Sequence, residues 1–212
     1  MSLPRPFYED SAVTIYHGDC REILPHVQAD VLVTDPPYGI AYKPAGGEGA
    51  LYARNKMAPV IGDSIPFDPR WLLGWDRLVL FGANHFAHLL PPSATWFVWD
   101  KREGYKEDWF ADCEMAWSNT GGPARLFRHY WMGGITASER YSKLHPTQKP
   151  VALMRWVINR VTKPGETIAD PYCGSGPILV AAKDLGRKAI GIEIEERYCE
   201  IAARRCAQEV LL

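Results

Sequence analysis

Short apolar runs alternate with helix-like segments along most of this chain. We expect strands at residues 13–17, 31–34, 77–81, 95–99, 114–117, 126–131, 167–169 and 189–192. We expect helices that begin at residue 21 and that cover residues 70–75, 84–90, 151–161, 178–185 and 195–210. Strands that alternate with helices are typical of a mainly parallel sheet with helices on both faces. The sequence therefore predicts an α/β fold.

The length and composition fit one domain, which we assign to residues 1–212. No apolar run reaches the roughly 18 residues that a membrane-spanning helix needs, and the N-terminus lacks the apolar core of a signal peptide. The five cysteines are scattered and form no Cys-x-x-Cys pair, so we expect no metal site and a reducing, cytoplasmic setting. The formal net charge of -1 leaves nucleic-acid binding open, because a local basic face is enough.

The tetrapeptide Asp35-Pro36-Pro37-Tyr38 directly follows the apolar run at residues 31–34. Two prolines after a strand end it in a stiff, extended turn. A carboxylate and an aromatic ring are thereby held at the carboxyl edge of the sheet, where open α/β folds bind their ligands. The carboxylate and a proline carbonyl can accept hydrogen bonds from an amino group, and the ring can stack on a flat heterocycle. The alternative is an ordinary strand-ending turn.

A second motif, Asp170-Pro171-Tyr172-Cys173-Gly174-Ser175-Gly176-Pro177, lies between a predicted strand and a predicted helix. Gly174 and Gly176 would let the backbone approach a ligand without a Cβ clash. Glu193 follows Gly174 by 19 positions, at the end of the next predicted strand, where an acid would bind a ribose diol. We interpret the motif as a nucleoside site, and the alternative is a tight turn with a solvated glutamate.

Two polar segments flank predicted helices. His145-Pro146-Thr147-Gln148-Lys149-Pro150 precedes the helix at 151–161. The free N–H groups at that helix start, aided by Lys149, would suit a carboxylate, although Thr147 or Gln148 could simply cap the helix. Asp19, after Gly18, could accept a hydrogen bond from a purine amino group or cap the helix that follows it.

Together these segments resemble the S-adenosylmethionine-dependent DNA amino-methyltransferases, which modify adenine N6 or cytosine N4. The resemblance covers most of the chain, and residues 81–84 and 99–101 also resemble strand ends of that family. It implies a Rossmann-like fold in which the catalytic motif precedes the cofactor loop, the permuted order of the family's β group. Small phage and prophage enzymes have this compact form, so we expect a bacterial or phage origin and a place in a restriction–modification system.

The resemblance assigns roles to individual residues. The catalytic residues would be Asp35, Pro36, Pro37 and Tyr38. The cofactor, S-adenosylmethionine, would contact Asp19, Asp35, His145, Thr147, Lys149, Asp170, Tyr172, Cys173, Gly174, Gly176 and Glu193. Asp at position 35 favours adenine N6 in duplex DNA, and the target base would leave the helix and stack on Tyr38. Direct in-line transfer needs no covalent intermediate and no catalytic cysteine.

DNA contacts are expected from the variable loops at about residues 39–66 and 118–144. Their basic residues suit phosphate binding and are Lys43, Arg54, Lys56, Arg125, Arg128, Arg140 and Lys143. Trp131 is the tryptophan that we expect to be exposed. The small recognition region suggests a short or loosely specified target, with help from a possible homodimer.

Three departures from the family pattern keep other functions open. Tyr172 stands where Phe is usual, Pro177 where Thr is usual, and Gly39 where many members have Asn. Pro177 removes a hydroxyl and a backbone donor near the cofactor, so a non-catalytic nucleic-acid-binding subunit is one alternative. Methylation of cytosine N4, RNA or a protein amide are others, although Ser is more usual for cytosine and Asn for the amide at position 35.

Overall fold

The structure, a computed structural model, describes residues 3–42, 60–104, 111–132, 135–139, 144–145 and 147–208. Five of the basic residues expected to contact DNA lie outside the described residues: Lys43, Arg54, Lys56, Arg140 and Lys143. Within the described ranges, no helix is both long enough and apolar enough to cross a membrane.

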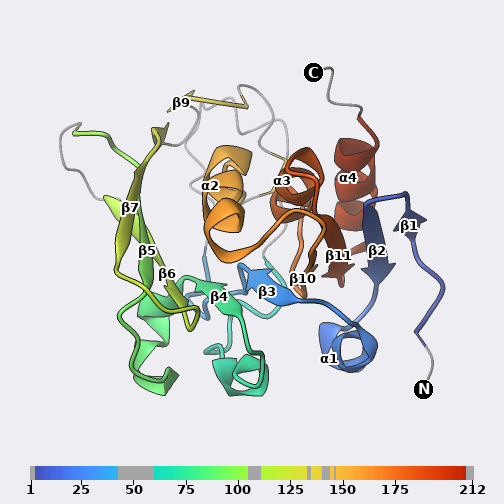
Figure 1. The fold of residues 1–212 in the computed structure, drawn as a ribbon, viewed down its shortest axis with the longest axis horizontal. Coiled ribbons are helices and arrows are strands. Elements are labelled where there is room, and N and C mark those ends of the chain that lie inside the picture. Colours follow the sequence, from blue (N-terminus) through green and yellow to red (C-terminus); the bar gives the residue numbers. More distant parts are fainter. Residues whose placement is uncertain are drawn as a thin grey trace.

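A nine-stranded sheet with the order β1-β2-β11-β10-β3-β4-β6-β5-β7 forms the centre of the fold (Figure 1). Its strands in chain order are β1 (Tyr8–Glu9), β2 (Val13–His17), β3 (Val31–Thr34), β4 (Leu78–Phe81), β5 (Trp96–Asp100), β6 (Cys113–Ser118), β7 (Arg125–Arg128), β10 (Thr167–Asp170) and β11 (Lys188–Glu193). A separate pair is formed by β8 (Trp131–Met132) and β9 (Ile135–Thr136). The five strands from β2 to β4 in the sheet order pair in parallel, so the predicted mostly parallel sheet is confirmed.

Helices cover both faces of this sheet. The three longer ones, α2 (Val151–Val161), α3 (Pro177–Asp184) and α4 (Glu196–Ala207), lie side by side over one face (Figure 1). The other face carries the short α1 (Cys20–Ile23) and the 3-10 turns η1 (Leu24–His26), η3 (Pro69–Leu72), η4 (Ala83–His85) and η5 (Ala87–Leu89). Each face has its own cluster of buried side chains. The predicted α/β architecture is therefore present, with unequal layers.

Three expected elements differ from the structure. The helix expected at 70–75 is one 3-10 turn, η3. The helix expected at 84–90 is two 3-10 turns, η4 and η5, because Phe86 leaves helical geometry at φ -132°. The strand expected at 126–131 is divided between β7 and β8. Trp131 is only 6% exposed and packs in the core beside α2, so the expectation that it is exposed was wrong.

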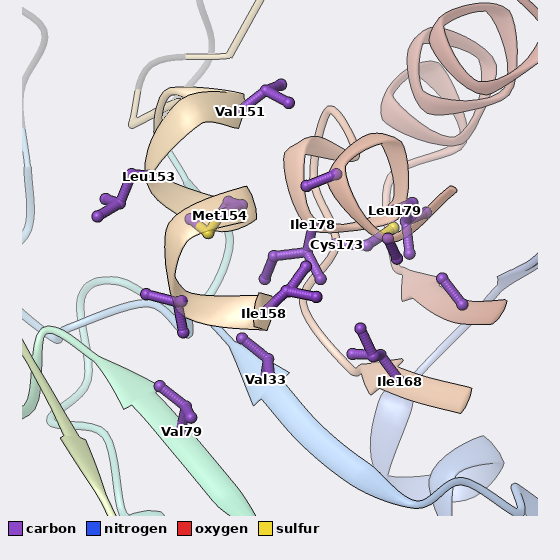
Figure 2. Close-up of a cluster of buried hydrophobic side chains, with 14 of the residues drawn as sticks. Val33, Val79, Val151, Leu153, Met154, Ile158, Ile168, Cys173, Ile178 and Leu179 are labelled. Atoms are coloured by element: carbon purple, nitrogen blue, oxygen red, sulfur yellow. The ribbon is translucent and has the colours of Figure 1, made fainter. Parts of the chain in front are cut away.

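The α2 helix fills the space above the middle of the sheet. Met154 and Ile158 are fully buried, lie four residues apart and so share one face of the helix. Figure 2 shows them above Val33 of β3 and Val79 of β4, with the α3 side chain Ile178 close to Ile158. Because β3 and α2 carry the two polar segments near the predicted site, this packing fixes how those segments lie relative to each other.

Shortening Ile158 tests this packing. We expect Ile158→Ala to lower the free energy of unfolding by about 2–5 kcal/mol, because it removes buried methyl groups and leaves a cavity. The neighbouring Asn159 is exposed on the same helix, so Asn159→Ala should change the free energy by less than about 0.5 kcal/mol. Urea unfolding of both variants would measure this, and equal losses would contradict the packing.

Candidate active site

The carboxyl ends of the parallel strands gather the motif residues at one edge of the sheet. Asp35 follows β3, Asp170 ends β10 and Glu193 ends β11, and these three strands lie within the parallel block. Asp19 follows β2, which pairs with β11. Segments that are far apart in the chain are therefore brought together as the motifs predicted.

The Asp35 carboxylate is bound by two side chains. The Tyr38 hydroxyl donates to Oδ1 at 2.6 Å, and the Lys149 ammonium donates to Oδ2 at 2.7 Å. Lys149 also donates to the Tyr38 hydroxyl oxygen at 2.8 Å, which closes a triangle of hydrogen bonds. Burial raises the pKa of Asp35, and the charge of Lys149 opposes that rise. The arrangement presents a partly buried carboxylate beside an aromatic ring.

Asp63 holds the turn that carries Tyr38. Its Oδ1 accepts the backbone N–H groups of Tyr38 and Gly39, each at 2.9 Å, and its Oδ2 accepts that of Tyr42 at 2.7 Å. The Asp63 side chain is buried, and a carboxylate that accepts several N–H groups fixes a loop without regular structure. Sequence reasoning missed this residue, and the only signal was an acid beside Gly62 inside a long loop.

The Tyr38 ring lies against the turn that follows β4. A Cβ on Gly82 would stand 1.9 Å from Tyr38 Cε1, and Gly82 has a φ of +67°. The exposed His85 stacks on Tyr38 with 5.0 Å between ring centroids and 19° between planes. Gly82 is therefore required for close approach, and the Tyr38 ring already stacks with a planar group.

The glycine loop is closed by Glu193. Glu193 Oε2 accepts the Gly174 N–H and Oε1 accepts the Glu195 N–H, each at 2.8 Å. Gly176 is the N-cap of α3 with φ 75°, and a Cβ there would lie 3.0 Å from Ala202 Cβ. Pro177 occupies the first turn of α3, where the missing N–H costs little. These features fit a nucleoside site, and Pro177 does not disturb the helix start.

Ile194, directly after Glu193, adds an apolar surface to this end of the edge. Its side chain is 48% exposed although it follows a buried strand. The Ile194 carbonyl oxygen lies 3.1 Å from the His17 ring nitrogen Nε2. This contact links Ile194 to β2. Sequence reasoning missed Ile194, and an apolar residue next to Glu193, the acid predicted to bind a ribose, would have been the signal.

Asp170 lies under the glycine loop. Its Oδ1 accepts the Thr34 hydroxyl at 2.7 Å and the Tyr172 N–H at 3.2 Å. Burial raises the pKa of Asp170 to about 7, with smaller contributions in the same direction from Asp35 and Glu193. Asp170 therefore supports the loop from beneath and joins it to β3.

The other residues of this loop and Asp19 have structural partners. The Tyr172 ring packs edge-on against Phe67 at 5.8 Å. Cys173 is buried in the core beneath α3, and burial raises the pKa of its thiol well above the ordinary value. Asp19 Oδ1 accepts the Arg21 N–H at 2.8 Å as the N-cap of α1, so the capping alternative is the one that the structure contains.

The polar segment before α2 also has partners within the chain. His145 packs on Tyr198 with 4.3 Å between ring centroids, beside the glycine loop, and Thr147 Oγ1 lies 3.2 Å from its Nδ1. Lys149 contacts Asp35 and Tyr38, and its contact with a carboxylate of the cofactor stays a prediction.

A carboxylate does lie at the α2 start, but it belongs to the chain itself. Glu139 Oε1 accepts the Val151 N–H at 2.6 Å, and its Oε2 accepts from Arg205 at 3.0 Å and from Gln148 at 3.1 Å. The first N–H of the helix is therefore occupied by a carboxylate of the chain itself.

Two predicted DNA contacts lie on the edge strand β7. Arg128, at its carboxyl end, is 3.6 Å from Asp100. Arg125 begins the strand. β5 and β4 both run antiparallel to β6, and β7 runs parallel to β5, so β7 runs in the same direction as β4 and β3. Arg128 therefore lies at the edge that carries Asp35, and Arg125 lies at the opposite end of the strand. Arg128 is the better placed of the two. Among the described residues, no group of three or more His, Cys, Asp or Glu could hold a metal ion.

Comparison with known proteins agrees with this geometry. The family model N6_N4_Mtase, described as DNA methylase, matches residues 100–204. The type II methyltransferase M2.LlaDCHI of Lactococcus lactis subsp. cremoris is 24% identical, with 96% of this chain and 92% of that protein covered. The chain is similar to the N6/N4 DNA methylases. The resemblance is thus confirmed, and the protein is a DNA methyltransferase.

Solved structures show the same fold. The complex of M1.HpyAVI with SAM has a TM-score of 0.59 and 23% identity, with 92% of this chain and all 100% of that chain covered. The PvuII DNA methyltransferase, described as cytosine-N4-specific, has a TM-score of 0.63 and 16% identity, with 98% and 90% covered. The predicted Rossmann-like fold is confirmed. S-adenosylmethionine is the methyl donor of this family.

Replacing Gly82 tests the contact with Tyr38. We expect Gly82→Ala to displace the Tyr38 ring and to reduce methyl transfer at least about 100-fold, because small misplacements of reacting groups are costly. Gly186 has the same φ of +67° with nothing within 4 Å of a Cβ, so Gly186→Ala carries the same backbone strain without the clash. DNA methylation by the two purified variants would separate the effects, and equal activities would contradict the contact.

The raised pKa of Asp170 predicts a pH-dependent stability. Between about pH 4, where the unfolded side chain ionises, and the folded pKa of about 7, unfolding releases a proton, so stability falls as pH rises. Asp170→Asn keeps the acceptor for Thr34 but cannot ionise. As the pH rises from 4 to 8, the free energy of unfolding of Asp170→Asn should therefore increase relative to that of the natural protein by an amount on the order of 3 kcal/mol.

Denaturant unfolding of both proteins across this pH range would measure the difference. A difference in unfolding free energy that stays constant with pH would show that folding does not raise the pKa of Asp170. A difference that grows up to about pH 7 and then levels off is the expected result.

Proposed function

We propose that this DNA methyltransferase transfers the methyl group of S-adenosylmethionine to the N6 amino group of adenine in double-stranded DNA. The observation that carries this is the Asp35 carboxylate beside the Tyr38 ring, at the same sheet edge as the glycine loop and Glu193. The bacterial type II relatives support a role in restriction–modification.

The cofactor would lie along the edge from β11 to β10. Glu193 would exchange its backbone N–H partners for the ribose hydroxyls, and the exposed Ile194 would cover the adenine ring. Gly174 would allow close approach of the donor because it has no Cβ. When bound, S-adenosylmethionine supplies a methyl group already activated by its positive sulfur.

Asp35 would act on the target amino group. The amino lone pair is delocalised into the adenine ring, and hydrogen bonds from the amino group to Asp35 and to the Pro36 carbonyl would favour a tetrahedral nitrogen with an available lone pair. The nitrogen–carbon bond forms as the carbon–sulfur bond breaks, and its electrons stay on sulfur. The surplus proton leaves the nitrogen for Asp35 and then for water. Positioning and electrostatics supply most of the acceleration.

Tyr38 would hold the base after it leaves the DNA stack. Its ring already stacks with the exposed His85, and a flipped base needs such a planar partner. Arg128 lies at the same sheet edge as Asp35 and could contact DNA phosphate.

Residues 1–212 would form one methyltransferase domain. A homodimer would be compatible with this function.

Methylation of cytosine N4 is the second candidate, because the PvuII neighbour is described as cytosine-N4-specific. The chemistry would be the same, since cytosine also carries an exocyclic amino group. Asp rather than Ser at position 35 favours adenine.

Methyl transfer to unmethylated duplex DNA tests the function, with the product nucleosides resolved by mass spectrometry. We expect N6-methyladenine, and a loss of at least about 100-fold in Asp35→Ala because the amino group loses its acceptor. The exposed Asp76 has no role in the site, so Asp76→Ala should retain activity.

The other outcomes are distinct. N4-methylcytosine would keep the mechanism and change the base. Absence of product on duplex and single-stranded DNA, with cofactor still bound, would reject DNA adenine as the substrate. Absence of cofactor binding would favour the non-catalytic subunit.

A further inference from the structure

A chain of four alternating charges runs from the catalytic carboxylate into the protein. Lys101 Nζ lies 2.8 Å from Glu114 Oε1, Glu114 Oε2 lies 3.1 Å from Lys149 Nζ, and Lys149 Nζ lies 2.7 Å from Asp35 Oδ2. Two lysines and two acids give this cluster no net charge. The Lys149 side chain is only 4% exposed, so its partners, rather than water, must stabilise its charge.

The four residues come from four separate segments of the chain. Asp35 follows β3, Lys149 precedes α2, Glu114 lies near the start of β6, and Lys101 follows β5. Glu114 reaches this edge because β6 runs antiparallel to both β4 and β5, so its first residues lie where its neighbours end. The cluster therefore forms only when these four segments have packed together. Once formed, it places the charges of Lys149 and Glu114 close to Asp35.

We propose, on the basis of the methyl-transfer function above, that Lys149 is a positioning residue that keeps Asp35 ionised and orients the Tyr38 hydroxyl, and that Glu114 controls how strongly Lys149 does so. Lys149 binds both groups directly and lies 5.2 Å from the centroid of the Tyr38 ring. Only an ionised Asp35 can accept both hydrogen bonds and still offer lone pairs to a target amino group.

The charges around Asp35 determine the sign of each effect. Lys149 lowers the pKa of Asp35, whereas burial and the charge of Glu114 raise it. Asp170 on β10 interacts electrostatically with Asp35 as well. Removing Lys149 would leave burial and the charge of Glu114 unopposed at Asp35, and its protonated form would then be favoured more strongly. Removing Glu114 in addition would relieve part of this repulsion and leave one lysine for one acid.

Three variants and a control follow from this charge balance. Lys149→Met removes the ammonium and leaves the cluster with one surplus negative charge. Lys149→Met combined with Glu114→Gln restores neutrality, and Lys149→Arg keeps the positive charge. Lys188 is an exposed lysine at the start of β11, so Lys188→Met is the matched control.

The first measurement is the pH dependence of the single-turnover methylation rate, with saturating DNA and cofactor. In Lys149→Met we expect the acid limb to move up by at least about one pH unit, which is a tenfold loss at low pH and a smaller loss at high pH. The double variant should move the limb back towards its original position, and Lys149→Arg and Lys188→Met should leave it in place. A uniform loss at every pH, with no recovery in the double variant, would overturn the role and leave Lys149 a structural residue.

The second measurement needs neither DNA nor cofactor. Carbon-13 NMR of the aspartate carboxyl carbons would follow the titration of Asp35, assigned with Asp35→Asn, in the natural protein and in each folded variant. A higher Asp35 pKa in Lys149→Met that falls again in the double variant is the expected result. An Asp35 titration that Lys149→Met does not move would overturn the inference. If the natural protein does not methylate DNA, the proposed function fails, and this titration still decides whether Lys149 controls Asp35.

Discussion

Parallel pairing of the five strands β2, β11, β10, β3 and β4 is the constraint on which the site depends. Strands that run in one direction end at one edge, so the residues that follow them become neighbours whatever their distance in the chain. Adjacent strands lie about 4.8 Å apart, so five strands present side chains over roughly 20 Å. That span accommodates a nucleoside at one end and a target base at the other.

The same edge concentrates negative charge, and the fold compensates each carboxylate differently. Glu193 accepts two backbone N–H groups, Asp170 accepts a hydroxyl and has a pKa raised to about 7, and Asp35 is bound by a buried ammonium. Gathering three acids lowers stability, and such local conflicts are expected at functional sites. An edge of this kind favours a donor that carries a positive charge.

The sequence was sufficient to locate the chemistry but not to assign every contact. The motif at residues 35–38, the glycine loop and Glu193 could be placed because each directly follows an apolar run, and a strand end is a local property. The strand borders were predicted closely where the apolar run was short and continuous. The helices over 70–75 and 84–90 were predicted incorrectly, because a short 3-10 turn has the same local sequence pattern as a short α-helix.

Contacts between distant segments were beyond local pattern. Asp63 holds the Tyr38 turn across a long loop, and Glu139 reaches the start of α2 from a segment without strong periodicity. Lys149 was assigned to the cofactor because helix N-termini attract anions, and its contact with Asp35 could not be read from the sequence. Glu114, the second acid beside Lys149, reaches this edge because β6 runs antiparallel to β4. A local sequence pattern does not reveal that course.

The permuted order of the two motifs has a simple physical consequence. Strand β3 precedes β10 by more than a hundred residues, but the two are direct neighbours in the sheet. The Thr34 hydroxyl on β3 donates to Asp170 on β10 at 2.7 Å, one residue before Asp35. This hydrogen bond and the backbone pairing of the two strands set the height of Asp35 relative to the glycine loop. Because in-line transfer depends on that height, the pairing of these two strands matters to the chemistry, whereas their order along the chain does not.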